Sequence, residues 1–136
     1  MPNVLLDTYR RLRDAYGPQH WWPGETPFEV MVGAILTQNT AWSNVERAIA
    51  HLRDAGALHG AVLLDLPDAS VAELIRPAGY FNVKTRRLKA LCAFLSAEGV
   101  LDAPEGLAAK AELAELRRRL LAVHGIGAET ADSILL

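Results

Sequence analysis

A very short glycine turn near the end of the sequence restricts the fold more than any other feature. The stretch LLAVHGIGAETADSIL places Gly125 and Gly127 two residues apart, between two segments whose apolar residues recur at helical spacing. Glycine permits positive φ at such positions and removes the side chains that would block a close approach. We therefore expect two helices joined by a tight turn, the hairpin occupying about residues 110–136.

The rest of the chain also shows helical spacing. Thr26 and Pro27 are expected to begin a helix that is apolar nearly all round as far as Thr37, which predicts that it is buried. Further helices are expected over 42–54 and 110–123, because apolar residues recur there every three or four positions. No stretch alternates apolar and polar residues as a strand does, so the predicted fold class is all-α.

Two helix starts are predicted from side-chain caps. Ser70 and Glu73 have the spacing of a capping box for a short helix that must stop before Pro77. Asn82 can cap the following helix. That helix is expected to turn Leu88, Leu91, Cys92 and Leu95 inward.

Composition excludes several classes of protein. The 136 residues carry a formal net charge of −2, so any nucleic-acid surface must be a local patch. The single cysteine excludes an internal disulfide framework and a self-contained cysteine-ligated zinc or iron–sulfur site. No apolar run is long enough for a membrane span, and the acids near the start argue against a signal peptide. The last helix stops in the middle of its apolar pattern, and we expect the chain to be a piece of a longer protein.

The turn also suggests a ligand. The helix after Gly127 would present unpaired backbone N–H groups and the positive end of its dipole, which together favour phosphate. The alternative is a plain helical hairpin with glycine turn residues. The pattern apolar–x–Gly–apolar–Gly–x–x–Thr–Ala favours the phosphate interpretation.

These residues resemble the helix-hairpin-helix of the endonuclease III (HhH-GPD) superfamily of DNA glycosylases. Residues 28–40, FEVMVGAILTQNT, look like the early buried helix of that family and its polar turn, and residues 79–88, GYFNVKTRRL, look like its glycine–aromatic–Lys segment. The resemblance implies a six-helix barrel domain over 19–136, incomplete at its C-terminus. Residues 1–18 would be an N-terminal helix of the second domain.

The resemblance assigns roles to the hairpin. It implies that His124, Gly125, Gly127, Glu129 and Thr130 bind a DNA backbone phosphate. Carbonyl groups of such hairpins hold a monovalent cation; the matching positions are Leu121, Val123 and Ile126.

Catalytic residues are expected outside this chain. Bifunctional relatives have a lysine where Glu129 stands, and a carboxylate cannot form the Schiff base of the lyase step. The catalytic aspartate of the family would lie beyond Leu136, as would the cysteines of any 4Fe-4S cluster. We therefore expect no catalytic residue and no cofactor within the chain.

Aromatic residues are candidates for the base pocket. A flipped, alkylated base is electron-poor, and aromatic faces attract it. The pattern WWP followed by LTQNTxW resembles the 3-methyladenine glycosylase branch, which implies that Trp21, Trp22 and Trp42 line the pocket. The alternative is that a tryptophan at helical spacing belongs to the core.

Polar residues complete the predicted site. Gln38 or Asn39 would fill the gap left by the flipped nucleotide, with Gln38 preferred; Asn39 could instead cap the next helix. Lys84, Arg86 and Arg87 form a local basic patch that could contact phosphates or could simply be solvated.

The predicted function is base-excision repair. The full-length protein would be a monofunctional glycosylase that hydrolyses the N-glycosidic bond of a damaged base, most simply an alkylated purine, and the fragment alone would be inactive. The alternatives are an endonuclease III-type enzyme acting on oxidised pyrimidines and a non-catalytic DNA-binding hairpin module. A helical protein-interaction domain is disfavoured by the Gly-x-Gly turn. We expect a monomer that binds double-stranded DNA, has no membrane partner and is cytoplasmic, associated with the nucleoid.

Overall fold

The computed structural model describes residues 26–135, which are helical with no strand. This confirms the predicted all-α class. The N-terminal helix and the assignment of residues 1–18 to another domain lie outside these residues. In chain order the elements are α2 (Pro27–Leu36), α3 (Trp42–Asp54), α4 (Gly60–Asp65), α5 (Asp68–Leu74), the 3-10 helix η1 (Arg76–Ala78), α6 (Phe81–Ala97), the 3-10 helix η2 (Pro104–Ala109), α7 (Leu113–Leu121) and α8 (Ala128–Leu135).

Helix α2 forms the centre of the fold. The hydroxyl Oγ1 of Thr26 accepts a hydrogen bond from the amide of Glu29 at 3.1 Å, and Pro27 occupies the first helical position, as the sequence predicts. Eight of the ten residues of α2 are buried. The helix packs against α3, α6, α8 and η2, which explains why it is apolar nearly all round.

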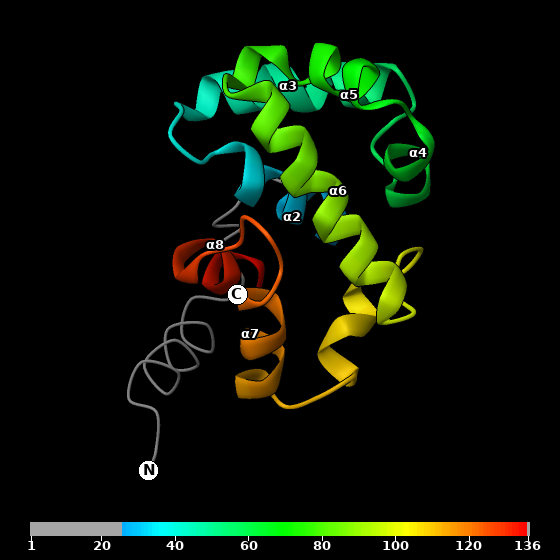
Figure 1. Cartoon of the computed structure of the whole chain (residues 1–136), viewed down its shortest axis with the longest axis vertical. Coiled ribbons are helices and arrows are strands. Elements are labelled where there is room, and N and C mark those ends of the chain that lie inside the picture. The colour runs from blue at the N-terminus through cyan, green and yellow to red at the C-terminus, as the bar shows by residue number, and fades with distance from the viewer. Residues whose placement is uncertain (1–25, 136) are drawn as a thin grey trace, which may run out of the picture.

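Two pairs of helices lie at opposite ends of the molecule (Figure 1). Helices α3 and α5 lie together at one end, and α7 and α8 lie together at the other. Helix α6 runs between these ends and packs against α2, α4 and α5. Its predicted inward residues are all fully buried: Leu88, Leu91, Cys92 and Leu95.

Two predicted helix caps are wrong. Helix α5 already begins at Asp68, so Ser70 lies inside the helix and caps nothing. Helix α6 begins at Phe81 after the left-handed Tyr80, which puts Asn82 within the first turn. Helix α4 has no signal in the sequence, because its six residues are too few to show a helical period.

The terminal hairpin differs slightly from expectation. Helix α7 spans Leu113–Leu121 rather than 110–123, because η2 ends at Ala109 and the chain bends through residues 110–112 before α7. Along residues 26–135, no helix is long and apolar enough to cross a membrane.

Candidate nucleic-acid interface

Helices α7 and α8 form the predicted hairpin, joined by residues 122–127. The amide of Val123 donates to Leu120 O at 3.0 Å, and the amide of Ile126 donates to Val123 O at 3.1 Å, which closes the turn. Ile126 is buried and fixes the turn to the core, whereas His124 is exposed. Gly125 has φ of 82°, a left-handed conformation that glycine adopts without strain. The tight glycine turn between two helices is therefore confirmed.

The outer side of the turn is open. A Cβ added to Gly127 would have no atom within 4 Å. Helix α8 begins directly after this glycine, and Gly127 O accepts from the amide of Ala131 at 2.9 Å, as in a regular first turn. The amides of Ala128, Glu129 and Thr130 belong to that first turn and have no partner within the helix. An anion approaching here would meet N–H groups and the positive end of the helix dipole.

The inner side of the turn rests on Arg87 of α6. A Cβ added to Gly125 would lie 2.2 Å from Cγ of Arg87, 2.6 Å from its Cδ and 2.8 Å from its Nε. The stem of Arg87 therefore lies directly against the backbone of the turn. From there its Nη1 donates a hydrogen bond to Oε1 of Gln38 at 2.5 Å.

Gln38 connects Arg87 to the hairpin. Its Nε2 donates to Gly125 O at 3.1 Å and to Oγ1 of Thr130 at 2.9 Å. Thr130 is buried, so its hydroxyl faces the protein. Of the predicted residues, Gln38, Arg87, Gly125 and Thr130 thus lie together, although Gln38 and Gly125 are 87 positions apart in the sequence.

Asn39 lies at the tip of the turn after α2. It has φ of 57° and an exposed side chain. It does not cap α3, whose N-cap residue is Ala41. To enter a duplex, Gln38 would have to break its three hydrogen bonds to the hairpin and to Arg87. Asn39 makes none of these hydrogen bonds.

The prediction that Lys84 contacts phosphate is wrong. Its side chain is 1% exposed, and Nζ donates to Leu36 O at 2.7 Å and to Ala78 O at 2.8 Å. Leu36 ends α2, where carbonyl groups lack helix partners and a cation is favourable. Burial, together with the nearby charge of Arg87, lowers the pKa of Lys84 to about 8. Lys84 therefore joins the end of α2 to η1 and fixes where the turn that carries Gln38 begins.

A family model described as "HhH-GPD superfamily base excision DNA repair protein" matches residues 32–131, a range that contains the turn after α2, the Arg87 segment and the hairpin turn. The chain belongs to this family.

Two relatives of the HhH-GPD chain agree with that assignment. A protein of Methanocaldococcus jannaschii, "Putative DNA repair glycosylase MJ1434", is 48% identical over 133 residues, which are 98% of this chain and 60% of the relative. The crystal structure of H. pylori 3-methyladenine DNA glycosylase (MagIII) bound to 1,N6-ethenoadenine matches with a TM-score of 0.68 and 29% sequence identity. That match covers 96% of this chain and 61% of the H. pylori chain. The chain thus spans about three fifths of the length of these relatives.

Other basic side chains near the HhH-GPD hairpin are paired with acids. Arg117 Nε lies 2.8 Å from Asp132 Oδ1 and joins α7 to α8. Hydrogen bonds from Arg118 and Arg119 lower the pKa of Glu115 to about 2. Arg86 is exposed on α6, so it can reach a phosphate, which stays a prediction.

Trp42 lies partly inside the fold. It is half-buried, and the six-membered ring of its indole packs against Gly33 of α2. A Cβ added to Gly33 would lie 3.2 Å from this ring. This contact gives Trp42 a packing role, while its pocket role stays a prediction. Trp21 and Trp22 lie outside the described residues.

The predicted cation ligands are backbone carbonyl groups at the hairpin. Leu121 ends α7 and is followed by the turn that contains Val123 and Ile126. The last carbonyl groups of α7 lack helix partners, whereas Val123 O already accepts from the amide of Ile126. A monovalent cation at these positions stays a prediction. Among residues 26–135, no group of His, Cys, Asp and Glu side chains could hold a metal ion.

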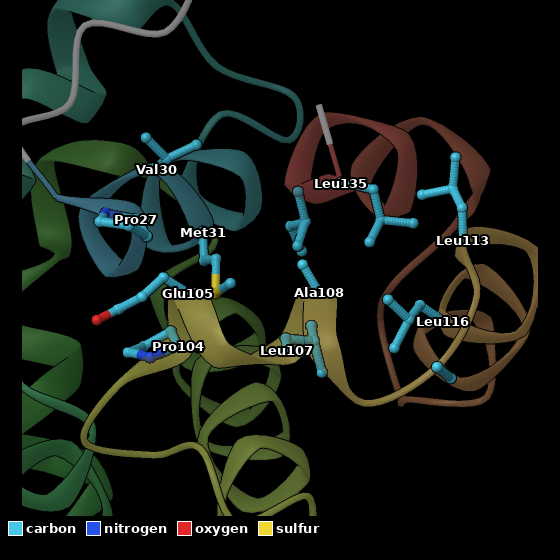
Figure 2. A pocket seen from close by; sticks show the side chains of 12 residues that line it. Pro27, Val30, Met31, Pro104, Glu105, Leu107, Ala108, Leu113, Leu116 and Leu135 are labelled. Atoms are coloured by element: carbon cyan, nitrogen blue, oxygen red, sulfur yellow. The ribbon is translucent and has the colours of Figure 1, made fainter. Parts of the chain in front are cut away.

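An apolar cavity of about 520 Å³ lies between α2, η2, α7 and α8 (Figure 2). Its lining contains neither the turn residues 122–127 nor Gln38 or Arg87, so it is separate from the outer side of the hairpin turn. The residues that line it are Pro27, Val30, Met31, Pro104, Glu105, Leu107, Ala108, Ala111, Leu113, Leu116, Ile134 and Leu135.

Sequence reasoning did not anticipate the contacts of Arg87 and Lys84. A signal for Lys84 was present, because it lies four residues before the buried Leu88 on the inward side of α6. The contact between Arg87 and Gly125 has no comparable signal, because it depends on how α6 and the hairpin pack.

Proposed function

We propose that the full-length protein is a DNA glycosylase of base-excision repair and that residues 122–130 bind a backbone phosphate of its substrate. The observation that carries this proposal is the open outer side of Gly127 in front of the first turn of α8. Backbone amides grip a phosphate without reading the base, which suits an enzyme that meets lesions in any sequence. Family membership and the two relatives support the proposal.

The proposed substrate is an alkylated purine in double-stranded DNA. The H. pylori relative is a 3-methyladenine glycosylase, seen with an ethenoadenine base. Trp42 would offer an aromatic face to the electron-poor base once it has left the stack. A DNA substrate also implies a protein associated with the nucleoid in the cytoplasm, and we propose that it acts as a monomer.

The proposed reaction is hydrolysis without strand cleavage. The N-glycosidic bond breaks with its electron pair leaving on the base, and a water molecule adds to C1′ of the deoxyribose and gives up a proton. Glu129 lies exposed in the first turn of α8. A carboxylate cannot attack C1′ as an amine does to form an imine, so no lyase step is expected from this position.

Excision by the full-length protein tests this proposal. Duplex DNA containing 3-methyladenine should release free base and leave an intact strand with an abasic site, and borohydride should trap no covalent adduct. A matched duplex with an oxidised pyrimidine should remain intact; its selective cleavage would instead indicate an endonuclease III-type substrate. Binding without release of any base would reduce the protein to a DNA-binding module.

Phosphate binding is tested separately by Gly127→Asp. The added carboxylate would face the bound phosphate across the first turn of α8, so affinity for duplex DNA should fall at least tenfold (about 1.4 kcal/mol) at low salt. Unchanged affinity would overturn the phosphate role of the hairpin.

A further inference from the structure

The turn after α2 and the hairpin turn are joined through side chains. Gln38 belongs to the first turn, and its amide group makes hydrogen bonds to Gly125 O, Thr130 Oγ1 and Arg87 Nη1. Both N–H groups and the oxygen of this amide are therefore engaged. Gln38 cannot turn to a new partner without releasing the hairpin.

Arg87 supports Gln38 and the hairpin turn from the inner side of that turn. Its stem fills the space beside Gly125, and Nε is buried without a hydrogen-bond partner among residues 26–135. Its far end donates to Gln38. The guanidinium is thus used to hold Gln38 and to support the glycine turn.

The orientation of the Gly125 carbonyl matters for an anion. Because Gly125 O accepts from Gln38, this oxygen faces the protein. A carbonyl oxygen turned to the outer side of the turn would repel a phosphate that the amides after Gly127 attract. Holding this oxygen inward keeps the outer side of the turn lined by donors.

We propose that Gln38 and Arg87 are positioning residues, a bridge that holds the hairpin turn in its phosphate-binding shape and fixes it relative to the turn that carries Asn39. The proposal rests on the proposed function for its consequence in DNA binding. It implies that the phosphate-binding amides of the hairpin and the tip of the turn after α2 approach the duplex at a fixed distance and orientation relative to each other. Arg87 would then act on DNA through the turn and not as a direct phosphate contact.

Hydrogen exchange in the DNA-free, full-length protein tests the bridge directly. Arg87→Met keeps a stem over Gly125 and removes the guanidinium, and the amides of Val123 and Ile126 should then exchange about tenfold faster. Arg86→Met is the matched control, because it removes the same charge from an exposed neighbour, and it should leave these amides unchanged. Equal exchange in the two variants would overturn the proposal.

A double-mutant cycle with Gln38→Ala tests whether the two residues act together. Once Arg87→Met has released Gln38, Gln38→Ala should add little further exchange, so the two effects should be far from additive. Should Arg87→Met fail to fold, Gln38→Glu tests the bridge instead. Its carboxylate still accepts from Arg87 but has no N–H group to donate to Gly125 O or to Thr130 Oγ1. Full protection of Val123 and Ile126 in Gln38→Glu would contradict the bridge.

The salt dependence of DNA binding separates positioning from contact. Arg87→Met should weaken binding of a duplex about tenfold while leaving the slope of log K against log salt unchanged, whereas a lost phosphate contact lowers that slope by about one. A lowered slope in Arg87→Met would overturn the positioning role. Should the wild-type protein bind no duplex at all, the proposed function fails, and the exchange results still decide the bridge.

Discussion

Arg87 occupies the space beside Gly125 in which any other residue would place its Cβ. That Cβ would lie 2.2 Å from Cγ of Arg87, well inside the distance that two carbon atoms tolerate. Gly125 also has φ of 82°, whereas the second glycine of the turn has neither a positive φ nor a close neighbour. The two glycines of the same turn therefore have different reasons to be glycine.

Gly125→Ala should destabilise the protein. The left-handed backbone costs about 1–2 kcal/mol for a residue with a Cβ, and displacing the stem of Arg87 adds a packing cost of similar size. We expect the free energy of unfolding in urea to fall by roughly 2–4 kcal/mol. A loss below about 0.5 kcal/mol would show that Arg87 moves aside freely and that the backbone is not strained.

Gly127→Ala should leave stability nearly unchanged and weaken DNA binding. Its Cβ would enter open space, so the free energy of unfolding should change by no more than about 0.5 kcal/mol. The methyl group would stand on the side from which a phosphate approaches, and we expect affinity for duplex DNA to fall about tenfold, or about 1.4 kcal/mol. Fluorescence anisotropy with a labelled duplex gives the affinity, and unchanged binding would count against a phosphate on this side of the turn.

Lys84 should make stability depend on pH. Its pKa in the folded protein, about 8, lies below the ordinary 10.5, so between these values the unfolded chain binds more protons than the folded one. The contribution of Lys84 to the free energy of unfolding should therefore rise as pH increases from about 8 to 10. Lys84→Met removes this group. The free energy of unfolding of the wild type minus that of the variant should therefore increase over that pH range. A difference that stays flat with pH would mean that the pKa of Lys84 is not lowered.

Much of the fold was predictable because it depends on local patterns. Thr26 and Pro27 predicted the start of α2, and the spacing of Leu88 and Leu91 predicted the buried side of α6. The cap assigned to Asn82 failed because Tyr80 takes a left-handed conformation that shifts the start of α6.

The candidate site was predictable only in part. The glycine turn is a local feature, and the sequence predicted it. The bridge through Gln38 depends on partners 49 and 87 positions away, which no local pattern can specify. The sequence predicted Lys84 to be a surface cation because a buried lysine is rare. The carbonyl groups of Leu36 and Ala78 accept its hydrogen bonds and make its burial tolerable.

Cys92 should be unreactive in the folded protein. It is fully buried in α6, and burial raises the pKa of its thiol to about 12 despite the nearby charge of Lys89. The thiolate is the reactive form, so a maleimide reagent at pH 7.5 should label the native protein far more slowly than the protein in urea. Comparable labelling in both states would mean that α6 opens readily, which would also weaken the support it gives to the hairpin.

Asn39→Gly should separate folding from insertion into DNA. Glycine adopts the left-handed conformation of this position at no steric cost, so the melting temperature should be preserved. If the exposed amide of Asn39 fills the gap left by the flipped base, excision of 3-methyladenine by the full-length protein should slow about tenfold, or about 1.4 kcal/mol in activation free energy. Ala41→Gly is the matched control, because it loosens the same loop at an exposed residue without removing an amide. Excision at the wild-type rate in Asn39→Gly would exclude Asn39 as the gap-filling residue and return that role to Gln38, which would then have to break the bridge to act.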